Sequence, residues 1–263
     1  MEKKGKIKIA YVEWACARAS TNVVKAVLQE KLGYDVNILS VSAAAMWQAV
    51  GSGDADAMVT AWLPGTHKEY LAAVQDKVEV LGPLSYGAKV GWVVPAYVTI
   101  NSIEELKANG DKFNHKIIGI DPGAGLMSAS EKAIVDYGLE DWKLVEGSGA
   151  TMTAALSDAI KNNEWIVVTG WAPHWKFGRW DLKFLEDPKV SLGPEEQIET
   201  VVRKGLKEDM PEAYAFLDNF NWTGSQMATV MDWNEADGSD PYETAKRYIE
   251  ENPDQVKEWL GQK

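Results

Sequence analysis

The sequence has few of the residues that build metal sites, disulfides or catalytic centres. It contains one cysteine, Cys16, and three histidines, His67, His115 and His174, among 263 residues. A single cysteine excludes a disulfide within the chain, and histidines this far apart do not form a zinc-binding pair. No Ser-His-Asp order and no pair of carboxylates has catalytic spacing. We therefore expect no metal, no cofactor and no enzymatic activity.

Positive charge is scarce as well. Lys and Arg number 27 against 39 Asp and Glu, which gives a formal net charge of −12. A nucleic-acid-binding surface needs clustered Lys and Arg, so we expect no nucleic-acid partner. The acidic charge weakly favours a cationic ligand, although the same charge also serves to keep a protein surface soluble.

Long apolar segments are missing too. No run reaches the roughly 18 residues that a membrane-spanning helix needs. The start, Met1-Glu2-Lys3-Lys4-Gly5, leads into a strand-like segment without the apolar region of a secretory signal. This start fits either a cytosolic protein or a mature form that has lost its signal, and the residues leave both open.

What the sequence does contain is a regular alternation of strand-like and helix-like segments. In the first half, apolar runs and helical periodicity predict these elements at Ile7–Tyr11, Ser20–Leu32, Asp35–Leu39, Ala43–Val50 and Ala57–Ala61. Ser20 and Thr21 are the expected caps of the first helix. Such alternation is typical of an α/β protein with a parallel sheet.

The second half repeats this order of elements. Strands and helices are expected at Lys116–Ile120, Ser128–Tyr137, Trp142–Val145, Met152–Ile160 and Trp165–Thr169. The strand end Ala61-Trp62-Leu63-Pro64 resembles Gly170-Trp171-Ala172-Pro173. A repeat of roughly a hundred residues is too long for a solenoid and indicates two related α/β lobes.

Two apolar segments are the expected crossings between these lobes, Ala88–Val98 and Ile198–Val202. They assign residues 1–95 and 201–263 to lobe I and residues 96–200 to lobe II. Helical patterns near the end of the chain, predicted to pack on lobe I, lie at Pro211–Asn219, Ser225–Asp232 and Pro241–Leu260. Two crossings between two lobes make a hinge, which suits closure around a ligand.

Tryptophan is abundant, with 12 residues, and three of them follow or end predicted strands. Trp14 follows the first strand, whereas Trp62 and Trp171 end equivalent strands of the two halves. Ligands of parallel α/β sheets bind outside the carboxyl ends of the strands. A quaternary ammonium group offers no N–H, and the negative face of an indole attracts it by about 0.5–2 kcal/mol per ring. The three rings therefore predict a site for such a cation.

A glycine-rich turn, Gly119–Ser128, joins a predicted strand to a predicted helix. The amides of a helix N-terminus bind anions, and Leu126 follows Gly125 where a phosphate-binding loop would have Lys. A carboxylate suits this turn better than a phosphate. His67, five residues after Trp62, is a further candidate donor to the same carboxylate.

At these segments the chain resembles the glycine betaine-binding proteins of bacterial ABC importers. The matching pieces cover most of the chain and are Tyr11–Asn22, Ala57–His67, Gly91–Pro95, Gly119–Ser128, Thr169–Trp175 and Val202–Gly205. Within the first of these pieces the residues after Trp14, usually acidic or polar in the family, are Ala15-Cys16-Ala17-Arg18.

The resemblance implies an α/β, two-lobed periplasmic-binding-protein fold of type II, with a ligand in the cleft between the lobes. It implies a tryptophan prism around trimethylammonium, formed by Trp14, Trp62 and Trp171. The carboxylate-binding groups would be the amides of Gly125 and Leu126 and the ring of His67. The resemblance further implies a monomer outside the cytoplasm, working with an ABC permease in the membrane.

Other interpretations remain open at this point. Within the same class, the ligand could be choline, carnitine, proline betaine or a sulfonium analogue. A small-molecule enzyme on the same lobes would need a positioned acid, base or nucleophile, and none can be assigned. A sensing domain of a larger regulator would need a DNA-binding segment, which the sequence does not contain.

Overall fold

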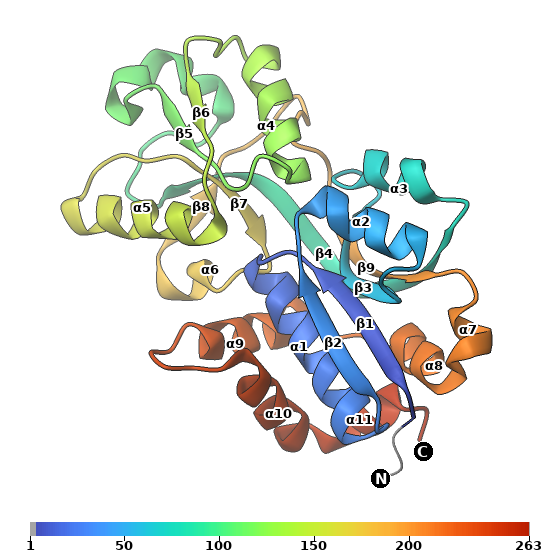
Figure 1. Cartoon of the computed structure of the whole chain (residues 1–263). Coiled ribbons are helices and arrows are strands. Elements are labelled where there is room, and N and C mark those ends of the chain that lie inside the picture. The colour runs from blue at the N-terminus through green and yellow to red at the C-terminus, as the bar shows by residue number, and fades with distance from the viewer. Residues whose placement is uncertain (1–3, 263) are drawn as a thin grey trace. The chain divides into compact units, whose positions relative to one another are not determined.

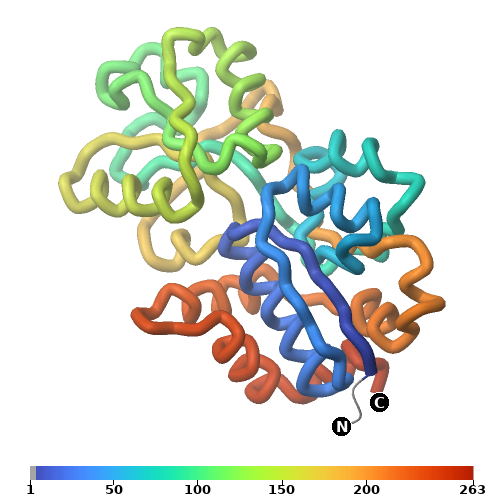
Figure 2. Tube along the Cα trace, in the orientation of Figure 1, coloured from blue at the N-terminus to red at the C-terminus, as the bar shows by residue number. Residues whose placement is uncertain are grey.

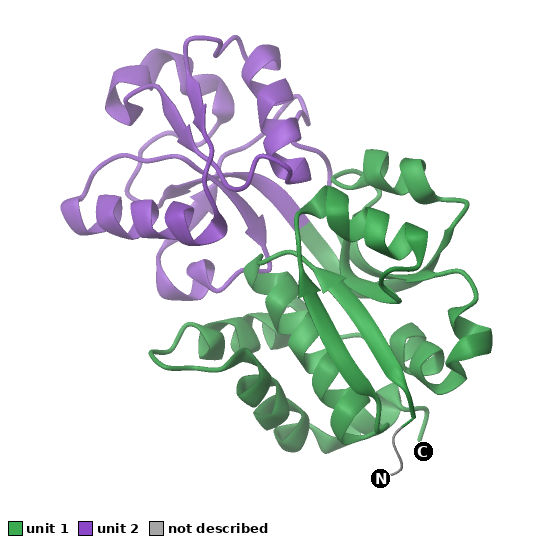
Figure 3. Cartoon of the chain, in the orientation of Figure 1, with its two compact units in different colours: residues 1–88, 196–263 green, residues 89–195 purple. Residues whose placement is uncertain are grey.

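The chain divides into two compact units (Figure 3). The structure is a computed structural model that describes residues 4–262. Unit 1 contains the described residues up to Ala88 and those from Glu196 onward, and unit 2 contains Lys89–Glu195. The chain therefore passes from one unit to the other at two places, and each unit is built from segments with an α/β order.

Unit 1 is an α/β layer structure around sheet A. Its first elements are β1 (Lys6–Tyr11), α1 (Ala15–Glu30), β2 (Asp35–Ser40), α2 (Ala43–Ser52), β3 (Ala57–Leu63) and α3 (Lys68–Val74). After unit 2 the chain returns as β9 (Glu196–Arg203), α7 (Leu206–Asp209), α8 (Pro211–Asn219), α9 (Gly224–Asn234), α10 (Pro241–Glu251) and α11 (Pro253–Trp259). Helices α9 and α10 pack against α1.

The strand order of sheet A is β2-β1-β3-β9-β4, where β4 (Val78–Pro95) is the strand that leaves unit 1. Strand β1 pairs in parallel with β2 and β3, and Figure 2 shows the traces of β1 and β2 side by side. Strand β9 is antiparallel to both β3 and β4. β3 is buried along its whole length, as expected for a strand in the middle of a covered sheet.

Unit 2 is built on sheet B, with the order β4-β7-β5-β6 and β8 on β4 (Figure 1). Its elements are η1 (Ile103–Glu105), η2 (Lys107–Phe113), β5 (Lys116–Ile118), α4 (Gly125–Asp136), β6 (Lys143–Val145), α5 (Gly149–Asn162), β7 (Val168–Ala172), α6 (Lys176–Arg179) and β8 (Leu182–Phe184). Its core gathers aromatic and aliphatic side chains around Trp92, Phe113 and Trp142.

The two units share one topology, which confirms the predicted repeat. In unit 1 the order β1-α1-β2-α2-β3 puts β1 between β2 and β3. In unit 2 the order β5-α4-β6-α5-β7 puts β5 between β6 and β7. Each third strand then pairs antiparallel with a crossing strand, β3 with β9 and β7 with β4. Trp62 and Trp171 consequently occupy equivalent strand ends.

Several local predictions were wrong for identifiable reasons. Helix α1 begins at Ala15, so Ser20 and Thr21 are buried inside it and do not cap it. The segment Pro241–Leu260 is split into two helices, because Pro253 removes a backbone donor and starts a new helix. The sheets are mixed rather than parallel, because both crossing strands run antiparallel to their neighbours.

The strand predicted at Trp165–Thr169 lies later, at Val168–Ala172. Trp171 therefore lies within the strand, one residue before its end, rather than beyond it. Among residues 4–262, no helix is both long enough and apolar enough to cross a lipid bilayer.

Candidate functional site

Trp14 occupies the N-cap position of α1, in the short connection that follows β1. Its backbone is extended, and its N–H donates to the carbonyl of Val12 at 2.7 Å. The indole is buried, and its ring centroid lies 5.6 Å from that of His67 at an interplanar angle of 33°. The N-cap of this helix is therefore a tryptophan, whereas Ser, Thr or Asp is the usual residue at this position.

Trp62 and His67 close the loop that follows β3. The backbone N–H of Trp62 donates to Nδ1 of His67 at 3.1 Å, and the N–H of His67 donates to the carbonyl of Trp62 at 2.9 Å. Both side chains are buried. His67 also contacts the Trp14 ring. Unit 1 therefore brings together the three ligand-binding residues that were predicted in its part of the chain, Trp14, Trp62 and His67.

The protonation state of His67 follows from these contacts. Its Nδ1 accepts a hydrogen bond, so the neutral ring must carry its proton on Nε2. Burial lowers the pKa of His67 from 6.5 to about 3, since the rings around it carry no charge to offset desolvation. Nε2 is buried and has no hydrogen-bond partner among the residues that the structure describes. His67 thus presents a neutral donor that lacks an acceptor.

Two aromatic residues that the sequence did not nominate hold this ring. Trp47 of α2 meets His67 edge-on at 5.8 Å, and Tyr70 of α3 does so at 5.9 Å. Trp47 lies on the buried face of α2 with Ala43, Met46 and Val50, and the sequence alone does not say which ring it contacts. The orientation of His67 is therefore fixed by tertiary packing as well as by the loop.

In unit 2, helix α4 begins at Gly125 with Ala124 as its N-cap. An alanine has no side-chain oxygen to accept from the first-turn amides, in contrast to Ser42, Ser148 and Thr223 at other helix starts. The amides of Gly125 and Leu126 are among the four donors that a helix leaves without intrahelical partners. This end of α4 therefore suits an anion from another source.

Trp171 lies near the end of β7, at the same carboxyl edge of sheet B from which α4 starts. Its ring meets His174 edge-on at 4.7 Å, and a Cβ built at Gly149, at the start of α5, would lie 3.9 Å from Cη2 of the ring. The buried ammonium Nζ of Lys176 lies 4.8 Å from the centroid of the Trp171 ring. Unit 2 thus places Trp171, Gly125 and Leu126 at one sheet edge.

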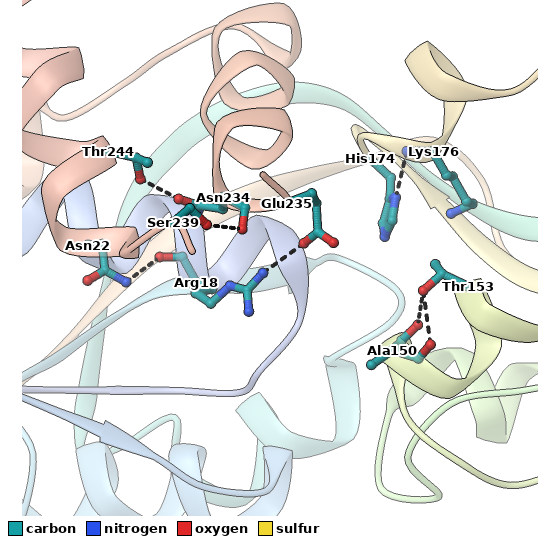
Figure 4. Close-up of polar contacts among 11 residues, drawn as sticks. Arg18, Asn22, Ala150, Thr153, His174, Lys176, Asn234, Glu235, Ser239 and Thr244 are labelled. Carbon is teal, nitrogen blue, oxygen red and sulfur yellow. Dashed lines mark hydrogen bonds and ion pairs between the residues drawn. The ribbon is translucent and has the colours of Figure 1, made fainter. Parts of the chain in front are cut away.

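His174 repeats a feature of His67. Its Nδ1 accepts the N–H of Lys176 at 3.1 Å, and Figure 4 shows the two residues joined by this bond. Burial, together with the Lys176 charge, holds the pKa of His174 well below 6.5. The sequence predicted neither the contact of His174 with the Trp171 ring nor its hydrogen bond with Lys176, because no periodic pattern indicates these contacts.

The unusual segment after Trp14 forms the first turn of α1. Cys16 is buried, and Arg18 donates from Nη2 to Glu235 at 2.8 Å (Figure 4). Both side chains of this ion pair are about a quarter to a third exposed. Arg18 therefore fastens α1 to the end of α9 within unit 1.

The chain has two α/β units of the same topology, two chain crossings between them, and a tryptophan at equivalent strand ends. This is the fold of two-lobed periplasmic binding proteins of type II. Residues 5–251 match the family described as the substrate binding domain of the ABC-type glycine betaine transport system. The chain belongs to this family.

Individual relatives agree with this assignment. The chain is 46% identical to a solved lactococcal protein crystallised in a closed form with glycine betaine, with a TM-score of 0.93, covering 98% of this chain and 100% of that one. It is 43% identical to a glycine betaine/L-proline-binding protein of Borrelia burgdorferi, with a TM-score of 0.93, covering 97% and 96% of the two chains.

A curated relative is longer. The chain is 51% identical over 163 residues to a glycine betaine/carnitine transport binding protein of Listeria monocytogenes. This match spans 61% of the chain and 54% of the relative, so it covers about half the length of that protein.

Proposed function

We propose that this protein is the solute-binding component of an ABC importer for glycine betaine. It holds the trimethylammonium group between the rings of Trp14, Trp62 and Trp171. It holds the carboxylate through His67 and the amides of Gly125 and Leu126. The competing ligands are choline and carnitine, which share the trimethylammonium group, proline betaine, whose quaternary nitrogen carries two methyl groups, and a sulfonium analogue.

The observation that carries the proposal is the state of His67. A buried N–H donor without an acceptor costs about 1–3 kcal/mol, so a fold tolerates it best where a ligand supplies the acceptor. The donor at Nε2 belongs to a neutral ring that contacts the indole of Trp14. A ligand with an anionic oxygen close to an N-methylated cation matches both groups at once.

The tryptophans support the cationic half of the proposal. Trp14, Trp62 and Trp171 are buried at strand or helix ends, which is where ligands of α/β sheets bind. Cation–π attraction and burial of methyl groups act together on a quaternary ammonium, which pays less to leave water than a primary amine does.

The family assignment supports the cellular role. A substrate-binding domain of an ABC transport system delivers its ligand to the transmembrane permease, and we place this chain outside the cytoplasm in that role. It acts as a monomer and performs no chemistry on the ligand.

Betaine is expected to bind about tenfold to a hundredfold more tightly than choline, because choline leaves the carboxylate donors unpaired. Isothermal titration with both ligands measures the ratio. His67→Ala should narrow the ratio only partly, since the two backbone amides remain. His115→Ala, at a half-buried histidine of unit 2 that pairs with Asp111 and Asp141, is the matched control and should leave the ratio unchanged. Equal affinity for the two ligands in the wild type would contradict carboxylate recognition.

The affinity for betaine is expected to be independent of pH between 8 and 5 as far as His67 is concerned. With its pKa lowered to about 3, the ring stays neutral and keeps its Nε2 proton throughout this range. Titrations at pH 8, 6.5 and 5 check this. A change of affinity in either direction, with a midpoint near 6.5 and absent in His67→Gln, would show that the ring titrates and would refute the neutral-donor role.

A further inference from the structure

The side chain of Glu196 accepts three hydrogen bonds from the loop between Trp62 and His67. Its Oε1 accepts the backbone N–H of Gly65 at 2.6 Å and that of Thr66 at 2.7 Å. Its Oε2 accepts the hydroxyl of Thr66. The residue is only 3% exposed. Each of the two carboxylate oxygens therefore accepts at least one hydrogen bond from this loop.

The sequence separates these partners by about 130 residues, and the sheet brings them together. Glu196 is the first residue of β9, which lies beside β3 in the register Gln197 to Leu63 and Ile198 to Trp62. The carboxylate therefore stands one step beyond the strand end that carries Trp62. It meets the chain where β3 turns away from the sheet.

Glu196 also marks the border of unit 1. It is the first residue of the unit after the chain returns from unit 2, and its partner on β4 is Ala88, the last residue before the chain leaves. Both crossings thus occur at this one pair. Because Glu196 belongs to one crossing strand and pairs with the other, a displacement of either strand is expected to displace the carboxylate and the loop bonded to it.

The bonds do not serve an ordinary structural purpose such as helix capping. The following helix, α3, begins at Lys68 with His67 at its N-cap, so the amides of Gly65 and Thr66 precede its first turn. Gly65 is fitted closely to the carboxylate, because a Cβ built at this position would lie 2.9 Å from Oε1 of Glu196. The contact specifies the path of the loop rather than the start of a helix.

We propose that Glu196 is a positioning residue of the ligand site, whose carboxylate fixes the loop that presents Trp62 and His67 and joins that loop to the chain crossing. This inference deepens the proposed function and rests on it for its ligand. Glu196 touches no ligand itself. It acts by holding the loop so that the Nε2 donor of His67 and the Trp62 ring stand in binding geometry.

Glu196→Ala is expected to weaken betaine binding by about tenfold to thirtyfold and choline binding by about threefold, because His67 reads only the carboxylate. The betaine-to-choline ratio therefore falls. Glu196→Gln should restore binding to within about threefold of the wild type, since its amide oxygen can still accept both N–H groups. Where the alanine variant does not fold, Glu196→Asp keeps the charge, withdraws the oxygens from the loop and should show the same fall in ratio.

Asp187→Ala is the matched control. Its carboxylate also accepts a backbone N–H, from Leu192 at 2.7 Å, and a hydroxyl, from Tyr137, but within unit 2. This control should lower the melting temperature and leave both affinities unchanged. If Glu196→Ala and Glu196→Asp also lower only the melting temperature, with the ratio intact, Glu196 is structural and the inference is overturned.

Amide hydrogen exchange without ligand separates this inference from the proposed function. The Trp62 amide is bonded to His67 Nδ1, and its protection should fall in Glu196→Ala and return in Glu196→Gln. A wild type that binds neither betaine nor choline would refute the proposed function, while the exchange data still decide whether Glu196 positions the loop. Unchanged protection of Trp62 in Glu196→Ala would overturn the positioning role.

Discussion

Alanine at Trp14, Trp62 or Trp171 is expected to weaken betaine binding by about 1–3 kcal/mol per substitution, or roughly fivefold to more than a hundredfold. Each replacement removes the attraction between an indole face and the cation together with an apolar contact to its methyl groups. Phenylalanine keeps a smaller ring at the same place and should cost less. Isothermal titration of the six variants gives the values.

Trp233→Ala provides the control for the loss of a tryptophan. Trp233 lies on α9 and already stacks on the guanidinium of Arg247 at 3.8 Å, so its removal also breaks a cation–π contact. It should leave betaine affinity unchanged. Because a buried Trp→Ala change also leaves a cavity, melting temperatures must show that each variant is folded during titration. Wild-type affinity in two of the three alanine variants would contradict a tryptophan cage.

Acid is expected to destabilise the protein through its buried histidines, by about 2 kcal/mol for His67 between pH 7 and pH 5. The pKa of His67 is about 3 in the folded chain and 6.5 when the ring is exposed. Between these values the unfolded state binds a proton that the folded state excludes. The free energy of unfolding must therefore decrease as the pH falls below about 6.5, and His174 acts in the same direction.

Urea denaturation at pH 7, 6 and 5 measures this effect. His67→Asn keeps an oxygen that can accept the Trp62 N–H but cannot be protonated, so its stability should change less between pH 7 and 5, by about 2 kcal/mol. Equal acid slopes in wild type and His67→Asn would show that His67 is not excluded from protonation in the folded state.

The sequence predicted the parts of this molecule that local patterns control. The apolar runs around Ile7–Tyr11 and Ala57–Ala61 gave strands close to their observed bounds, because buried central strands are apolar on both faces. The repeated Trp-x-Pro at Trp62 and Trp171 predicted the equivalence of two strand ends, and the common topology of the units confirms it. The family followed from motifs of the same kind.

Features that depend on the folded backbone or on distant partners could not be predicted from such patterns. The start of α1 was misplaced because Trp14 caps the helix with its backbone alone, whereas the more typical cap residues Ser20 and Thr21 are buried. The proton position on His67 depends on a bond to its own loop, and the role of Glu196 depends on the register of β9 against β3. Neither has a signature in the residues nearby.

The N-caps of α1 and α4 stand at the same point of the shared topology, yet one is Trp14 and the other Ala124. On the proposed function, this difference lets two equivalent positions serve different ends of the ligand. A ligand with a cation at one end and an anion at the other cannot be served by two identical halves. On that proposal, the N-cap of α1 contributes an indole to the positive end of the ligand, whereas the N-cap of α4 leaves the amides of Gly125 and Leu126 for the negative end. The different residues at these two N-caps thus correspond to the opposite charges at the two ends of the proposed ligand.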